Sequence, residues 1–229
     1  PGVVAVFTSK DIPGRNRVGL AIKDQRVLCD DKVRFIGDPV ALVAAETLEA
    51  AEEALRLIRV DYDDLPGIFS PDEAFAPGAV QIHETGNVVI DRKLIKGNFE
   101  QALEQADVVI RNTYRTPMVY HACLEPGAGI ATYDGDRVTV WMPSKEIYVD
   151  HPCISTFLGL PLEKVRLIAG PIGGAFGDKR GLSAGYYAAL ASLKTKRPAK
   201  MVLTREEYAF VGTKRHPFTM EYTTAATKD

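Results

Sequence analysis

A glycine-rich turn within residues 165–180, VRLIAGPIGGAFGDKR, carries the residue types best suited to holding a charged ligand. Gly173, Gly174 and Gly177 have no side chain to keep a ligand away from the backbone, and they can adopt positive φ. A short apolar run typical of a strand precedes the turn, and residues 182–195 follow it with apolar positions at helical spacing. We therefore expect the turn to open a helix whose first N–H groups are free to attract an anion.

Neither common phosphate-binding motif matches this turn. Ile172 stands where both the P-loop and the G-x-G-x-x-G dinucleotide motif require a glycine, counting back from Gly177. Asp178 takes the place of the P-loop lysine. The turn is thus either the cradle of another kind of cofactor or a purely structural turn.

Composition indicates an ordinary globular protein of 229 residues, 25% charged, with a formal net charge of −2. The sequence has no clustered basic face, no apolar run long enough to cross a bilayer and no secretory leader, so we expect neither nucleic acid nor a membrane as partner. Cys29, Cys123 and Cys153 are widely spaced without a C-x-x-C pair. This spacing argues against a disulfide framework, a zinc site or an iron–sulfur site, and it favours a cytoplasmic location.

The elements that must position the turn predict a mixed α/β fold of the α+β class. Residues 1–67 carry a helix at 48–57, capped by Thr47, and four runs typical of strands: 3–8, 30–36, 39–45 and 59–62. Of these, 39–45 has the continuous apolar pattern of a strand buried on both faces.

Residues 68–95 are rich in turn formers and predict a linker. The remaining part, residues 96–229, again mixes the two kinds of element. Its expected helices are 99–106, 144–158 and 182–195, and its expected strands are 107–114, 129–133, 137–141, 165–169 and 199–204. The chain starts without methionine and ends without a closing element, so we expect a piece of a larger polypeptide.

An ordered set of motifs resembles the molybdopterin-binding large chain of the xanthine dehydrogenase and aldehyde oxidase family. In the first part, the motifs resemble the family's α/β hammerhead domain: Asp11-Ile12-Pro13-Gly14, the run 30–43 and the run 60–66. In the second part, they resemble the start of its molybdopterin domain: Lys96-Gly97-Asn98, His121, Leu124-Glu125-Pro126, the glycine turn, Arg205-Glu206-Glu207 and Arg215-His216-Pro217.

This resemblance implies part of a molybdenum hydroxylase that oxidises an aldehyde or an N-heterocycle with oxygen from water. It implies a molybdenum–molybdopterin cofactor, with iron–sulfur centres and FAD on other domains or subunits as electron-transfer partners. The expected cofactor-binding residues are Gly173, Gly174, Ala175, Phe176 and Gly177, and no side chain of this chain is expected to bind the metal directly. The other expected partners are the remainder of the large chain and a small-molecule substrate.

Three positions near the expected cofactor carry particular implications. The resemblance places Phe176 in the wall of the substrate pocket, although it could instead anchor the turn in the core. Lys145 stands where the family often has a glutamine beside the metal, so it either approaches the cofactor or points away. Arg180 replaces a glutamate that contacts purines in relatives, which suits an anionic substrate, but it could equally be a plain surface charge.

The family's catalytic glutamate comes from a motif far along the chain, so the base is expected beyond Asp229, and this stretch alone is expected to be inactive. Glu125 is expected to be structural, capping or pairing with His121 or an arginine. Two other interpretations stay open: a catalytically inactive scaffold subunit of the same family, and a generic α/β nucleotide-binding domain.

Overall fold

A computed structural model describes residues 1–19 and 22–228. The described chain forms two compact units, and neither is continuous in sequence. Unit 1 combines Pro1–Tyr62 with Tyr120–Lys214, and unit 2 combines Asp63–Val119 with Arg215–Asp229. Both mix helices with strands, which confirms the predicted α+β class.

Unit 1 is built on a mixed four-stranded sheet. In spatial order its strands are β6 (Val165–Ile168), β5 (Val138–Trp141), β4 (Ala128–Tyr133) and β7 (Ala199–Val202). β4 and β5 correspond to the predicted strands 129–133 and 137–141 and form an antiparallel hairpin, in which Asp134 Oδ1 accepts hydrogen bonds from the N–H groups of Asp136 and Arg137. β5 and β6 are parallel and are connected through α4 (Ile147–Leu158) and the short 3₁₀ turn η2 (Leu162–Lys164).

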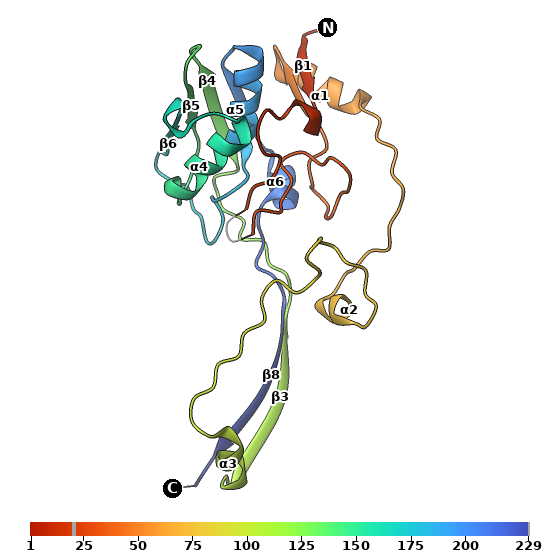
Figure 1. Cartoon of the computed structure of the whole chain (residues 1–229), viewed down its shortest axis with the longest axis vertical. Coiled ribbons are helices and arrows are strands. Elements are labelled where there is room, and N and C mark those ends of the chain that lie inside the picture. Colours follow the sequence, from red (N-terminus) through yellow and green to blue (C-terminus); the bar gives the residue numbers. More distant parts are fainter. Residues whose placement is uncertain (20–21, 229) are drawn as a thin grey trace. The chain divides into compact units, whose positions relative to one another are not determined.

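Helix α5 (Ala184–Thr195) packs against β4, β5 and β7 and forms the centre of the core (Figure 1). Its residues are buried from Ala184 to Leu193. A Cβ atom added to Gly129 of β4 would lie 2.3 Å from the Cα atom of Gly185. The helix can therefore approach the sheet this closely only because two glycines meet at the contact.

The N-terminal segment of unit 1 contains β1 (Val3–Phe7), which pairs antiparallel with β2 (Leu42–Ala45), and α1 (Leu48–Leu57). The predicted cap of α1 is present, because Thr47 Oγ1 accepts the Ala50 N–H at 3.2 Å. After the 3₁₀ turn η1 (Ser9–Asp11), the Gly14 N–H bonds to the Phe157 carbonyl at 3.1 Å at the end of α4. A Cβ atom on Gly14 would lie 2.1 Å from a backbone oxygen, so this contact requires glycine.

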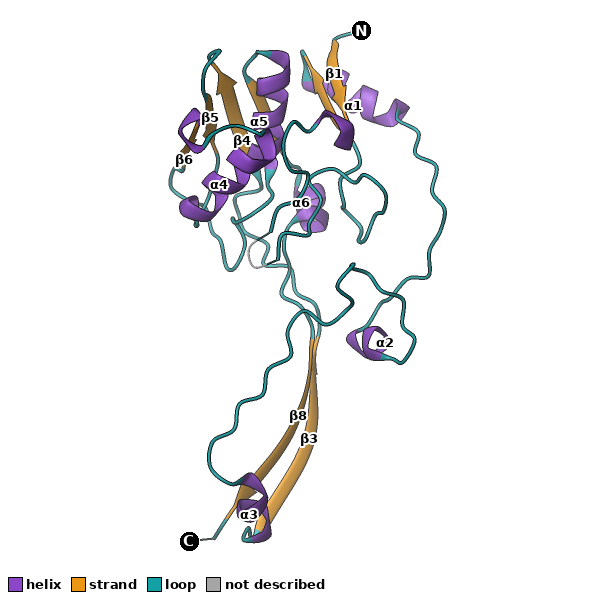
Figure 2. Ribbon diagram, viewed as in Figure 1, coloured by secondary structure: helices purple, strands orange, loops and turns teal. Residues whose placement is uncertain are grey.

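Unit 2 is dominated by a two-stranded antiparallel ribbon of β3 (Val108–Thr116) and β8 (Phe218–Ala226), which Figure 2 shows in orange. It also contains α2 (Pro71–Phe75) and α3 (Phe99–Glu104). All nine residues of β3 are exposed. Asn87 organises the loop around α2, because its side-chain NH₂ donates to the carbonyls of Ala74 and Val80 at 3.1 and 2.9 Å.

Two predicted strands are wrong. Residues 30–36 form a loop held by side chains, in which Asp38 Oδ2 accepts the Arg34 N–H at 2.9 Å. Residues 59–62 belong to no helix or strand of the described structure. β2 begins later than expected, and its residues are half-buried, so the prediction of burial on both faces is also wrong.

Other helices and strands also begin at residues other than those expected, because contacts with segments distant in sequence determine where they start. α4 begins at Ile147 rather than at 144, and the 68–95 stretch contains α2. Helix α6 (Arg205–Val211) and β8 were not predicted. In residues 1–19 and 22–228, no helix has the length and apolar character needed to span a membrane.

Candidate functional site

The glycine loop, residues 173–177, follows β6 and is fixed at both ends. At its start, the Gly173 N–H donates to Glu125 Oε2 at 2.9 Å, and the Glu125 N–H donates to the Gly173 carbonyl at 3.2 Å. Further along, the Ala175 carbonyl accepts the Asp178 N–H at 2.8 Å and the Cys123 thiol at 3.2 Å. The segment containing Cys123 and Glu125 therefore holds the loop in one conformation.

Four consecutive N–H groups between these fixed ends, those of Gly174, Ala175, Phe176 and Gly177, bond to no acceptor in the part of the chain that the structure describes. Positive φ angles of 99°, 48° and 104° at Gly174, Phe176 and Gly177 shape this turn. A Cβ atom on Gly177 would meet nothing within 4 Å, so open space lies above the backbone there. Successive free N–H groups in such a turn form a concave binding site for an anion.

The start of helix α5 does not contribute to this anion site. α5 begins at Ala184, after an intervening segment, and Ala184 is fully buried. The Tyr186 N–H is bonded to the Ser183 carbonyl at 3.0 Å. The predicted helix therefore begins at Ala184 rather than at residue 182, so the free donors next to Phe176 are those of the loop itself.

Phe176 projects from the loop with 80% of its surface exposed. The alternative that it anchors the loop in the core is therefore wrong. Its φ of 48° is unusual for a residue with a side chain, and such strain is concentrated at functional sites.

Lys145 and Arg180, which are far apart in sequence, share one carboxylate. Lys145 Nζ lies 3.6 Å and Arg180 Nη1 lies 3.4 Å from Glu146 Oε1. The Lys145 N–H donates to the Lys179 carbonyl at 2.9 Å, which joins the two segments. Arg180 Nε is buried and has no hydrogen-bond partner among the described residues, so the pair retains an unused donor as well as an excess positive charge.

Asp150, which is buried in the core, accepts hydrogen bonds from the residues next to Lys145 and Arg180 in sequence. Ser144 Oγ donates to Asp150 Oδ2 at 2.5 Å, and the Gly181 N–H and Tyr186 hydroxyl donate to Asp150 Oδ1 at 2.8 and 3.0 Å. Burial raises the pKa of Asp150 above its ordinary value, although the three hydrogen bonds oppose that effect. Sequence reasoning missed this residue, and its only local signal is an acidic side chain on an otherwise apolar helix.

Glu125 is structural, as predicted, but its partners differ from those expected. Its carboxylate lies 3.4 Å from Lys179 Nζ, not beside His121 or an arginine. Lys179 Nζ also donates to the carbonyls of Glu125 and Pro126 at 2.7 and 3.0 Å. His121 instead faces Asp178, with Nε2 3.5 Å from Asp178 Oδ2.

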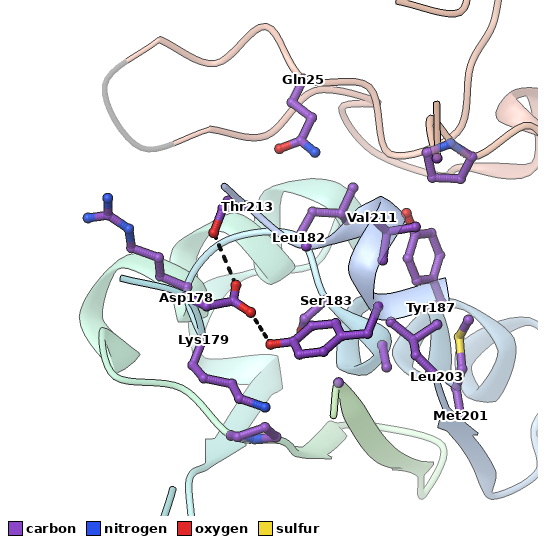
Figure 3. Close-up of a pocket in the computed structure, with 18 of the residues that line it drawn as sticks. Gln25, Asp178, Lys179, Leu182, Ser183, Tyr187, Met201, Leu203, Val211 and Thr213 are labelled. Carbon is purple, nitrogen blue, oxygen red and sulfur yellow. Dashed lines mark hydrogen bonds between the residues drawn. The ribbon is translucent and has the colours of Figure 1, made fainter. Parts of the chain in front are cut away.

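A cavity of about 130 Å³ lies on the inner side of the segment that follows the loop (Figure 3). Asp178, Lys179 and Arg180 line its polar end. Most of the remaining wall is apolar and includes the following residues: Phe35, Leu42, Leu182, Tyr187, Met201 and Leu203. Phe176 is not among the residues that line this cavity.

Two family models match most of the chain. Residues 82–229 match the family described as molybdopterin cofactor-binding domain, and residues 1–66 match the aldehyde oxidase and xanthine dehydrogenase a/b hammerhead domain. The chain is 42% identical to the nicotinate dehydrogenase large molybdopterin subunit of Eubacterium barkeri, over 100% of this chain and 54% of that protein. It is 41% identical to a probable xanthine dehydrogenase subunit of Bacillus subtilis, over 98% of this chain and 30% of that protein.

Among solved structures, the aldehyde oxidoreductase from Desulfovibrio gigas superposes with a TM-score of 0.94 at 29% identity, covering 100% of this chain and 26% of that one. The chain thus spans between 16% and 54% of the length of the curated relatives compared with it, and so covers only part of each of them.

Proposed function

The chain belongs to the family of molybdopterin-binding large subunits of xanthine dehydrogenases and aldehyde oxidases, and we propose that it holds the cofactor beside the substrate in a molybdenum hydroxylase. The intact protein would oxidise an aldehyde or an N-heterocycle with oxygen from water. The observation that carries this proposal is the run of four free N–H groups from Gly174 to Gly177, held open by the Glu125 contacts.

The residues present fit an anionic cofactor. We propose that Gly173, Gly174, Ala175, Phe176 and Gly177 contact it through their backbone, with no side chain binding the metal. The absence of side-chain atoms above Gly177 lets a bulky group approach the free N–H groups, which supply fixed dipoles for negative charge. When bound, the cofactor supplies two-electron oxidation with oxygen from water. The exposed Phe176 ring would exclude water from one side and offer a planar surface to an aromatic substrate.

The charge pattern supports an anionic substrate. Lys145 and Arg180 bring two positive charges against the single negative charge of Glu146, and Arg180 has an unused buried donor. A substrate carboxylate could replace Glu146 as the partner of Arg180 through charge-assisted hydrogen bonds. One relative is named for nicotinate, a carboxylated N-heterocycle, and we propose that class of substrate here.

The remaining machinery is proposed to lie elsewhere. The carboxylate that removes the proton is expected beyond Asp229, and iron–sulfur and FAD partners would carry the electrons away. One relative is named as a large subunit, which supports an assembly with partner subunits. The three free cysteines are consistent with a reducing, cytoplasmic compartment.

Turnover of the intact enzyme in heavy-oxygen water tests the reaction type. The purified full-length protein with its partner subunits is incubated with a carboxylated N-heterocycle and an artificial electron acceptor. We expect heavy oxygen to enter the product from water, with the acceptor reduced in equal amount. An active preparation whose product carries no label from water would contradict a hydroxylase, and a correctly assembled protein with cofactor but no turnover would favour an inactive scaffold subunit.

A further inference from the structure

A separate group of metal-ligand side chains lies next to the glycine loop in unit 1. A ring nitrogen of His121, the Cys123 thiol and a carboxylate oxygen of Asp178 all lie within 4.8 Å of one another. The three residues are almost completely enclosed: Cys123 and Asp178 are 0% and 5% exposed, and the His121 side chain is 9% exposed. Folding brings these side chains together from two segments, so no local cysteine spacing signals them.

His121 lacks the partner that a buried imidazole needs. Both of its ring nitrogens are buried, and neither has a hydrogen-bond partner among the described residues. The nearest charged atom, Asp178 Oδ2, lies 3.5 Å from Nε2. Leaving buried polar atoms unsatisfied destabilises a folded protein, so such an atom calls for a partner of another kind.

Asp178 is held as a metal-binding carboxylate usually is. The Thr213 hydroxyl donates to Oδ1 at 3.1 Å, and the Tyr208 hydroxyl donates to Oδ2. Figure 3 shows both hydrogen bonds converging on this side chain. Hydrogen bonds to a ligating carboxylate fix its orientation toward a metal ion.

The positive groups around the cluster are engaged with backbone oxygens. Lys179, Arg205 and Lys214 each donate to two carbonyls, and none of them is bonded to a side chain of the cluster. The acceptors are, in that order, Glu125 and Pro126, Cys123 and Leu124, and Phe210 and Gly212. The bonds of Lys179 and Arg205 fix the segment that carries Cys123, and the three cations make no hydrogen bond to the ligand atoms.

We propose that His121, Cys123 and Asp178 bind one divalent cation of the zinc type. A nitrogen, a thiolate sulfur and a carboxylate oxygen are the ligands that zinc accepts, and three of them leave the fourth tetrahedral position to water. The Cys123 thiol releases its proton to solvent when the cation binds. Because Asp178 follows the glycine loop and Cys123 contacts Ala175, the cation would fix the loop to the segment beside it.

This proposal is independent of the molybdenum chemistry. The test uses the intact full-length enzyme, supplied with two equivalents of zinc chloride and then dialysed. We expect about one zinc per chain, with one sulfur neighbour at about 2.3 Å and nitrogen or oxygen neighbours at about 2.0–2.2 Å in zinc-edge X-ray absorption. Molybdenum measured in the same sample reports the cofactor separately.

Cys123→Ser should remove the sulfur neighbour and release the zinc, and His121→Gln should lower zinc affinity at least tenfold. Cys153→Ser is the matched control, because Cys153 is also a buried free thiol but lies outside the cluster. Failure of wild-type enzyme to retain zinc would overturn the proposal, as would a sulfur signal that survives Cys123→Ser. The wild-type result decides the matter even where a variant fails to fold.

Discussion

Gly173 and Glu125 bond to each other in both directions, because the Gly173 N–H donates to Glu125 Oε2 at 2.9 Å and the Glu125 N–H donates to the Gly173 carbonyl at 3.2 Å. This pair fixes the start of a loop whose next four N–H groups bond to no acceptor among the described residues. The Glu125 carboxylate thus serves to shape the loop, and the proposed cofactor contacts depend on it.

Glu125→Ala should weaken cofactor binding and destabilise the fold. It leaves the Gly173 N–H and the Lys179 side chain, which is 2% exposed, without their carboxylate partner. Such a loss costs about 1–3 kcal/mol. Glu125→Gln keeps an acceptor for Gly173 and should lose less. Molybdenum per chain and urea denaturation measure the two effects. Equal molybdenum content in Glu125→Ala and wild type would contradict the role given to this residue.

Gly173→Ala should be far more harmful than Gly170→Ala. A Cβ atom on Gly173 would lie 2.6 Å from Glu125 Cβ, a contact that forces the loop to move, whereas one on Gly170 meets nothing within 4 Å. Overpacking of this kind costs about 1–3 kcal/mol. Melting temperature and molybdenum content should both fall in Gly173→Ala and stay near wild type in Gly170→Ala. Similar values for the two variants would show that the loop adapts freely.

Asp150→Asn should destabilise unit 1 by about 1–3 kcal/mol. An amide in place of Asp150 turns one oxygen acceptor into a donor, so one of the hydrogen bonds from Ser144, Gly181 and Tyr186 is lost inside the core. Urea denaturation at neutral pH measures the change. Asp61→Asn, at an exposed position outside every helix and strand, is the control and should change stability little. An Asp150→Asn variant as stable as wild type would mean that the hydrogen bonds to Asp150 contribute nothing to the stability of unit 1.

The same residue predicts a pH dependence with a defined sign. Burial holds the pKa of Asp150 in the folded state above its value of about 4 in the unfolded chain. The folded state therefore binds the proton more tightly, and this contribution to stability is complete below pH of about 4 and is lost as the pH rises through the folded pKa. The difference in the free energy of unfolding between wild type and Asp150→Asn should therefore become smaller as the pH rises from about 4 through the folded pKa of Asp150. A difference that grows as the pH rises would mean that the pKa is lowered instead.

Arg180→Glu should reverse the preference for a carboxylated substrate. Loss of a charge-assisted pair and gain of a repulsive one should lower the ratio of kcat/KM for nicotinate over nicotinamide at least about tenfold. Arg56→Glu, an exposed position on α1, makes the same charge change and should leave the ratio unaltered. A ratio unaffected by Arg180→Glu would remove this residue from substrate selection.

Helices and strands that depend on residues close in sequence could be predicted from local sequence patterns. Thr47 caps α1 as predicted, because its side-chain oxygen accepts the N–H of Ala50, three residues ahead. The wrong strand at 30–36 has the alternating pattern of a strand, but side-chain bonds such as Asp38 to Arg34 make it a loop. Strand β8 was missed because its partner, β3, lies far away in sequence.

At the candidate site, too, the sequence did not predict contacts between residues that lie far apart in the chain. The glycine loop was recognisable, but the contact of Glu146 with both Lys145 and Arg180 depends on how the chain folds back on itself. The closeness of His121, Cys123 and Asp178 likewise has no local pattern. Residue types indicated the chemistry, and only the fold determined which of them meet.

The molybdenum and pterin content of the intact protein tests the central claim most directly. The full-length chain, purified with its partner subunits and shown to be active, should contain about one molybdenum and one pterin per large chain, and Gly177→Ala should lose most of both because its φ of 104° strains any side chain. An active preparation without molybdenum would contradict the claim that the glycine loop holds this cofactor.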